Sequence, residues 1–206
     1  MKIKTFYILL MLCVGGQLFA QQKMSAAEAE TFRNAVNAAA KTTRTLQTDF
    51  TQLKHMDFLA KDIESSGKMF FKAGQLKWQY SKPYQYSIIF KKDKILINDA
   101  GKKSNIDNNK MFDKLSRLIM GSVSGNMFDE KEFTISYLKD KTQNLTVLIP
   151  KDASLRKYIG KMELYFDKTS NTVTEVRMIE PSGDYTKIIF KNKALNSSID
   201  DAVFNQ

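Results

Sequence analysis

The segment LKWQYSKPYQYSIIF, residues 76–90, is the most informative part of this chain for its fold. In its first half Leu76, Trp78 and Tyr80 alternate with polar residues, and large apolar residues alternate again in the second half up to Ile88 and Phe90. A period of two places successive side chains on opposite faces of the backbone. The segment therefore predicts antiparallel strands that each bury one face.

The same alternation recurs on both sides of this segment. It begins near residue 45 and returns in short runs at residues 95–97, 133–137, 145–149, 162–166, 176–178 and 188–190. Polar segments with turn-forming residues, at 139–143, 167–172 and 181–184, separate several of the later runs. About ten strands are expected, so the chain is predicted to be mainly β.

One amphipathic helix is expected before the strands. Ser25 and Glu28 have the spacing of a capping box, in which each side chain bonds the backbone of the other. An alanine-rich stretch follows to about Thr43, with Phe32 and Val36 at helical spacing. The pattern predicts a helix with one apolar face.

A second helix is expected in the middle of the chain, from Asn108 to Gly121. Four apolar residues share one face of it: Met111, Leu115, Leu118 and Ile119. Gly121 and Gly125 follow and give the chain room to bend. The helix is interpreted either as a plug in an open barrel end or as a movable lid, and a plug that can be displaced is a lid.

The first twenty residues have the pattern of a cleaved signal peptide. Lys2 and Lys4 precede an apolar stretch from Phe6 to Val14, and Ala20 completes a plausible cleavage site. The apolar stretch is shorter than the roughly 20 residues that span a bilayer. The only cysteine, Cys13, lies in this leader. We therefore expect export and a mature protein without a cysteine, a disulfide or a lipid anchor.

Residues 21–206 have the length of a single domain, predicted here to carry a solvated, lysine-rich surface. The formal net charge is +10 for the whole chain, and loss of Lys2 and Lys4 with the leader lowers it to +8. Such charge suits nucleic acid, an anionic membrane or an acidic partner. Export argues against nucleic acid.

Patterns typical of catalytic sites are missing from the sequence. His55 is the only histidine, and no group of His, Asp and Glu has the spacing of a zinc site. No serine lies in a G-x-S-x-G turn, and no glycine-rich phosphate loop is present. We predict that the protein is not an enzyme and has no catalytic residue, metal site or cofactor.

Large, adaptable apolar side chains are abundant, with 14 Phe, 8 Tyr and 10 Met. Their simplest role is an ordinary core. However, a half-closed sheet of about ten strands covered by only two helices can enclose apolar volume that side chains do not fill. A lipid-sized cavity is the functional interpretation.

Three segments together resemble the outer-membrane lipoprotein carrier (LolA) family. They are LQTDFTQ at 46–52, GKMFFK at 67–72 and LKWQYSKP at 76–83, in the order and spacing of the family. The resemblance implies an α+β fold: an unclosed antiparallel half-barrel of about ten to eleven strands. An N-terminal helix and a mid-chain lid helix are then expected to enclose an apolar cavity over one lipoprotein-carrier-like domain, residues 21–206.

The resemblance implies a periplasmic chaperone. Such a protein accepts acylated lipoproteins from an inner-membrane ABC transporter, shields their acyl chains and passes them to an outer-membrane acceptor. A carrier is physically necessary, because at about 0.8 kcal/mol per CH₂ a chain of roughly 16 carbons resists transfer into water by on the order of 10 kcal/mol. We expect a monomer.

The expected acyl-chain site is the strand face richest in large side chains. The candidates are Phe50, Phe70, Trp78, Tyr80, Ile88, Phe90 and Ile97. Which parity faces inward is not decided by the sequence, and the alternatives on the opposite faces are Phe71, Ile89 and Leu96.

One departure from the family concerns an arginine that many members place shortly before the tryptophan strand, where it hydrogen-bonds the lid. This chain has Ala73 and Gly74 there. Three other roles stay open beside the lipoprotein carrier. They are a carrier for another amphiphile, such as a glycolipid or lipidic pigment, an envelope-stress lipid sensor with a similar half-barrel, and an esterase-like enzyme.

Overall fold

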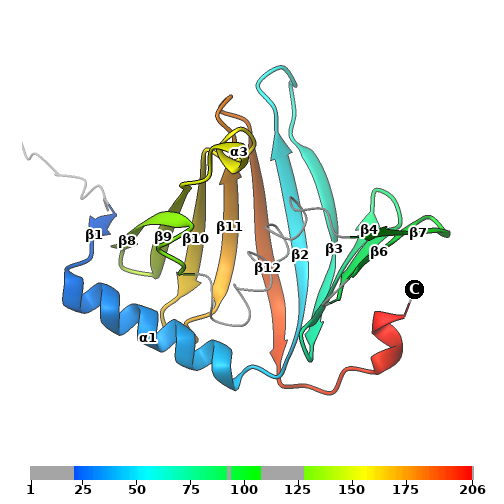
Figure 1. Cartoon of the computed structure of the whole chain (residues 1–206), viewed down its shortest axis with the longest axis horizontal. Helices are drawn as coiled ribbons and strands as arrows, with labels where there is room; N and C mark the ends of the chain where they lie inside the picture. Colours follow the sequence, from blue (N-terminus) through cyan, green and yellow to red (C-terminus); the bar gives the residue numbers. More distant parts are fainter. Residues whose placement is uncertain (1–20, 92–93, 108–127, 206) are drawn as a thin grey trace, which may run out of the picture.

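The computed structural model describes residues 21–91, 94–107 and 128–205 (Figure 1). The expected signal peptide, residues 1–20, lies outside the described residues. So do the four expected lid residues, Met111, Leu115, Leu118 and Ile119.

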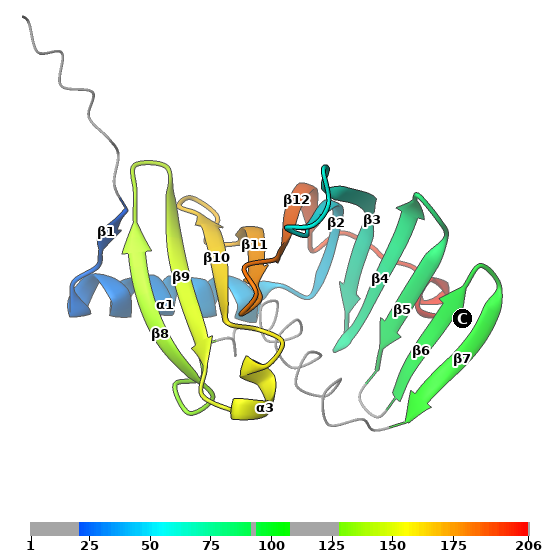
Figure 2. The same cartoon turned by 90° about the horizontal axis from the view of Figure 1, so that it is seen from above.

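The described strands form one twelve-stranded antiparallel sheet in the order β1-β8-β9-β10-β11-β12-β2-β3-β4-β5-β6-β7. Their bounds are β1 Gln22–Lys23, β2 Thr45–His55, β3 Ile63–Lys72, β4 Gln75–Lys82, β5 Tyr86–Phe90, β6 Lys94–Asp99, β7 Lys102–Asp107, β8 Phe133–Lys139, β9 Gln143–Pro150, β10 Lys161–Asp167, β11 Val173–Ile179 and β12 Tyr185–Leu195. β1 and β7 end the sheet without pairing with each other, so the sheet is open. Figure 2 shows the strands arranged along an arc between these edges.

The fold class is confirmed as mainly β with an unclosed antiparallel sheet, and the described residues form twelve strands where ten to eleven were expected. β1 has only two residues, too few to show an alternation. β7 has the sequence KKSNID, which lacks alternating apolar residues, and it pairs with β6 through the backbone. Backbone pairing does not require an apolar face, so the side-chain pattern missed both edge strands.

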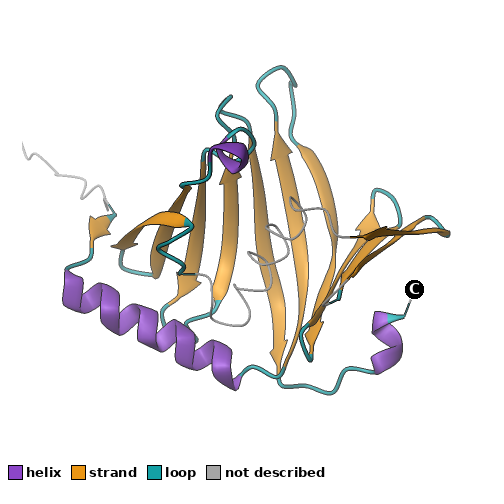
Figure 3. Ribbon diagram, in the orientation of Figure 1, coloured by secondary structure: helices purple, strands orange, loops and turns teal. Residues whose placement is uncertain are grey.

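The helix α1, Ala26–Thr42, confirms the predicted N-terminal helix. The backbone N–H of Glu28 donates to Ser25 Oγ at 3.3 Å, and the Ser25 N–H donates to Glu28 Oε2 at 2.9 Å. Phe32 and Val36 are buried in a cluster with inward side chains of β8, β9 and β10. Figure 3 shows α1 crossing one end of this half of the sheet. The helix thus covers the β8–β11 half.

Two short helices complete the described structure. α3, Ala153–Arg156, is capped by Asp152, whose side chain accepts two backbone N–H bonds. The 3₁₀ helix η1, Asp201–Phe204, packs near the C-terminus on the outer face of the sheet, where Phe204 is buried with Ile89. No helix among the described residues is long and apolar enough to span a membrane.

The inward face of the β2–β6 half carries a second cluster of buried side chains: Phe50, Met69, Phe71, Leu76, Trp78, Phe90 and Ile95. Opposite residues in register share this face, since Trp78 pairs with Met69 on one side and with Ile88 on the other. The two inward-facing clusters lie on opposite halves of the arc. The space between them is the place for a ligand site.

Candidate functional site

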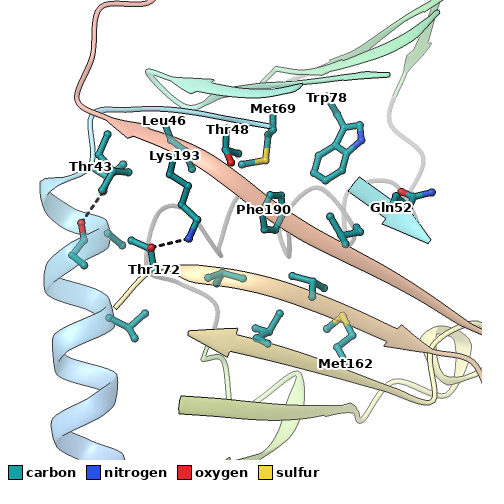
Figure 4. A pocket seen from close by; sticks show the side chains of 18 of the residues that line it. Thr43, Leu46, Thr48, Gln52, Met69, Trp78, Met162, Thr172, Phe190 and Lys193 are labelled. Atoms are coloured by element: carbon teal, nitrogen blue, oxygen red, sulfur yellow. Dashed lines mark hydrogen bonds between the residues drawn. The ribbon is translucent and has the colours of Figure 1, made fainter. Parts of the chain in front are cut away.

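A cavity of about 320 Å³ lies between the two halves of the sheet and the C-terminal part of α1. Strands β2–β5 and β9–β12 supply the other described walls, and Figure 4 shows their side chains pointing into the space. Most of the described lining is apolar. Its apolar members are Val36, Ala39, Ala40, Leu46, Met69, Trp78, Tyr80, Ile88, Phe90, Leu148, Met162, Leu164, Val173, Val176, Met178, Ile188, Phe190 and Leu195.

Four of the seven expected site residues lie on this lining: Trp78, Tyr80, Ile88 and Phe90. They come from β4 and β5, the strands formed by the segment at residues 76–90. Their register explains the shared direction, because Trp78 pairs with Ile88 and Leu76 pairs with Phe90. Residues paired across two antiparallel strands point to the same face.

Two further expected residues lie behind the lining. Phe50 is 2% exposed and its ring centroid lies 4.3 Å from that of Trp78, so it supports the wall from beneath. Ile97 is half-buried and packs against the same cluster. Neither borders the cavity itself.

The expected place of Phe70 needs correction. Phe70 packs on the outer face with Leu96 and Phe204, whereas its neighbours Met69 and Phe71 belong to the inward cluster. Since adjacent strand residues point to opposite faces, Met69 takes the place on the cavity wall that was expected of Phe70. Of the three alternatives on the opposite faces, Phe71 in β3 faces inward. Ile89 in β5 and Leu96 in β6 face outward.

The second half of the lining was not among the candidates. It comes from α1 and from β9–β12, including Met162, Leu164, Val176 and Ile188. A signal was present, because the even-numbered runs at 162–166, 176–178 and 188–190 are the apolar face of those strands. These strands face β4 across the arc because the whole sheet is curved.

Four aromatic side chains pack together in one wall of the cavity: Phe50, Trp78, Tyr80 and Phe190. Trp78 contacts Phe50 and also Phe190 of β12, at 6.1 Å between ring centroids and nearly perpendicular. Tyr80 donates its hydroxyl hydrogen to Gln52 Oε1 at 2.9 Å. Burial raises the pKa of Tyr80, so the phenol is neutral at physiological pH. The Tyr80 hydroxyl is thus satisfied, whereas the buried Trp78 Nε1 has no hydrogen-bond partner among the described residues.

Gly67 of β3 makes this group possible. The Phe50 ring lies across Gly67, and a Cβ there would approach Phe50 Cζ to 2.9 Å and the Gln79 carbonyl oxygen to 1.9 Å. A register shift falls between Ser66 and Gly67 in the same place. The glycine therefore permits a close approach of β4 and the ring that no other residue allows.

Lys193 of β12 is the one charged residue among the lining residues that the structure describes. Its ammonium donates to Thr172 Oγ1 at 2.9 Å (Figure 4). Burial lowers the pKa of Lys193 to about 8, while the nearby Asp167 carboxylate works in the opposite direction. The cavity thus has an apolar body and one cationic end.

The described lining contains no histidine, aspartate, glutamate, serine or cysteine. His55 lies at the end of β2, away from the cavity, between Asp57 and Asp62 and stacked on Tyr185. Its hydrogen bond to Asp62 raises the pKa of the imidazole. No group of metal-binding side chains occurs among the described residues.

Ala73 and Gly74, which stand where the resemblance noted from the sequence would place an arginine, form the tight turn between β3 and β4. Both have positive φ, 49° and 73°. Two such residues suit the two-residue turn of a hairpin. Neither residue borders the cavity.

Comparison with known proteins places these features in a family. The family model described as outer membrane lipoprotein carrier protein LolA matches residues 41–206. Comparison with curated protein sequences gave no match. Among solved structures, an uncharacterized conserved protein from Thermus thermophilus is similar in fold, with a TM-score of 0.53 and 9% identity over 86% of this chain and 93% of that one.

Two other solved structures are more distant in geometry. A LolA superfamily protein from Nitrosomonas europaea has a TM-score of 0.47 and 11% identity, over 86% of this chain and 97% of that one. The lipoprotein LppX from Mycobacterium tuberculosis has a TM-score of 0.48 and 10% identity, over 85% of this chain and 99% of that one.

Proposed function

Because this chain belongs to the outer membrane lipoprotein carrier protein LolA family, we propose that it is a carrier of the bacterial envelope that binds acyl chains. In this proposal it receives lipoproteins released from the inner membrane by an ABC transporter, and an outer-membrane acceptor takes them over. The leader at residues 1–20 would direct it to the periplasm, where it would act as a monomer without a cofactor.

One observation carries the proposal: the apolar cavity between the two halves of the sheet. An acyl chain placed there would contact Trp78 and Phe90 on one side and Met162 and Val176 on the other. At about 0.8 kcal/mol per buried CH₂, each segment of chain that contacts this lining offsets part of the cost of leaving the membrane.

The open sheet also suits a carrier. Strands β1 and β7 do not pair with each other, so the two halves can change their separation without breaking the hydrogen bonds of a closed barrel. A cargo that must enter and leave needs a cavity whose two halves can separate. Permanent closure would favour retention over delivery.

The test is to purify the exported protein from its own envelope without detergent and identify bound molecules by mass spectrometry of the intact complex. Acylated lipoproteins bound one-to-one are expected. Ile188→Lys places a charge in the lining at a half-buried position and should abolish binding. Tyr84→Lys is the matched control, because Tyr84 is 59% exposed and outside the lining.

Circular dichroism must show that both variants fold. Loss of cargo from Ile188→Lys alone supports the cavity as the binding site. Equal cargo on both variants would show that binding does not depend on the cavity, and a wild-type protein that is empty and rejects acyl probes would mean that the apolar faces are simply core.

A carrier for a different amphiphile is the second candidate, and Lys193 is the observation that favours it. Acyl esters and amides of a lipoprotein need no cationic partner. In the same mass spectra, a free acidic amphiphile without lipoprotein would support this second candidate.

A further inference from the structure

The described lining carries a charge at one end only. Lys193, Thr172 and Thr43 gather beside the C-terminal end of α1, whereas Trp78 and Phe190 lie farther along the space (Figure 4). The Thr43 hydroxyl is occupied, since it donates to the Ala39 carbonyl oxygen at 2.8 Å. Lys193 is the charged group at this end, and it has donors left for a ligand.

The ammonium of Lys193 has three hydrogens, and its described bond to Thr172 Oγ1 uses one of them. It forms no ion pair with a described residue. Asp167 is the nearby carboxylate, but its Oδ1 already accepts from the backbone N–H groups of Thr169 and Ser170 and from the Ser170 hydroxyl. The described residues thus compensate the charge of Lys193 only in part.

A half-buried cation without an ion pair is costly for the folded protein. The lowered pKa of Lys193 reflects that cost and agrees with the geometry. A perturbed ionisable group in an apolar cleft is a candidate for ligand binding. An oxyanion brought in with a ligand would restore the missing partner, with charge-assisted hydrogen bonds to the remaining N–H groups.

We propose that Lys193 binds the acidic head group, a carboxylate or a phosphate, of an amphiphile whose acyl tail lies along the apolar lining. This inference rests on the proposed function for one property only, the ability of the cavity to accept an acyl chain. It adds selection by head-group charge. The protein then distinguishes an acidic single-chain lipid from a neutral one of the same length.

The experiment compares ligands that share one tail at about pH 7, where dodecanoic acid is ionised. Dodecanoic acid, dodecan-1-ol and 1-dodecanoylglycerol 3-phosphate are titrated into the wild-type protein by calorimetry, with inorganic phosphate as the tail-free control. The wild type should bind an acidic ligand at least about tenfold more tightly than the alcohol. A preference for dodecanoate indicates a free fatty acid, and a preference for the phosphate indicates a phospholipid.

Three variants locate the preference. Lys193→Met keeps the length of the side chain and should bind acid and alcohol equally, whereas Lys193→Arg should retain the preference. Lys191→Met is the matched control, since Lys191 is an exposed lysine on the same strand.

The outcomes separate the two proposals. Equal binding of acid and alcohol by the wild type would overturn the role of Lys193 and leave the acyl cavity in place. A preference that survives in Lys193→Met would also overturn it. Failure of all three lipids to bind would instead contradict the proposed function.

Discussion

Replacement of Gly67 by alanine is expected to destabilise the fold strongly, and its magnitude follows from two contacts. The added Cβ would lie 1.9 Å from the Gln79 carbonyl oxygen and 2.9 Å from Phe50 Cζ. The ring can rotate or shift, but the carbonyl belongs to the backbone of β4, so β3 and β4 must separate locally. Overpacking of this kind costs about 3 kcal/mol or more.

Urea unfolding followed by circular dichroism measures this change. A loss of about 3 kcal/mol corresponds to a fall in Tm of roughly 6–12 °C for a domain of this size. Ser66→Ala is the control at the neighbouring, half-buried position, and it should change the free energy of unfolding by less than about 1 kcal/mol.

A double variant separates the two contacts. Adding Phe50→Leu to Gly67→Ala removes the ring but leaves the clash with Gln79, so stability should not return. A Gly67→Ala protein within about 1 kcal/mol of wild type would show that β3 and β4 accommodate the methyl group, contrary to this expectation. Full rescue by Phe50→Leu would show that the ring, and not the backbone, sets the requirement for glycine.

Three other predictions concern stability. The pKa of Lys193 is lowered to about 8 in the folded protein, so between that value and 10.5 the unfolded chain binds more protons and folding becomes more favourable as pH rises. Relative to Lys193→Met, the wild type should gain roughly 1–2 kcal/mol in unfolding free energy across that pH interval, after allowance for solvent screening. A difference in unfolding free energy between the two proteins that does not change with pH would contradict this. Thr146 is fully buried and its hydroxyl has no described partner, so Thr146→Val should stabilise by about 1 kcal/mol in urea unfolding, and a loss of stability would reveal a hidden bond. Ala73 has a φ of 49°, which asparagine tolerates better, so Ala73→Asn should raise the midpoint of thermal unfolding by a few degrees, corresponding to about 0.5–1 kcal/mol.

The sequence predicted the strands of the sheet interior well because their side chains alternate. It could not decide the parity of β3, since Phe70 and Phe71 are adjacent and equally apolar. The decision comes from pairing, in which Phe71 lies opposite Leu76 and Met69 opposite Trp78. Parity is therefore a property of neighbouring strands and not of one run of residues.

A β-bulge in β12 explains why the alternation in the sequence did not place Lys193 in the cavity. Counting by twos from Phe190 places Asn192 inward and Lys193 outward, toward solvent. The structure has a register shift between Lys191 and Ala194, with Asn192 at a φ of 52°. The extra residue reverses the faces, so Lys193 lines the cavity and Leu195 lies opposite Leu46.

Occupation of the cavity by acyl chains can be tested through Trp78, the single tryptophan of the chain. Because Trp78 lines the cavity, its fluorescence reports on that site alone. A diacylated lipopeptide with bromine atoms in its acyl chains is added in detergent-free buffer, with the unbrominated lipopeptide as control. We predict saturable quenching at one lipopeptide per protein by the brominated form only, and unchanged Trp78 emission would contradict the proposed binding site.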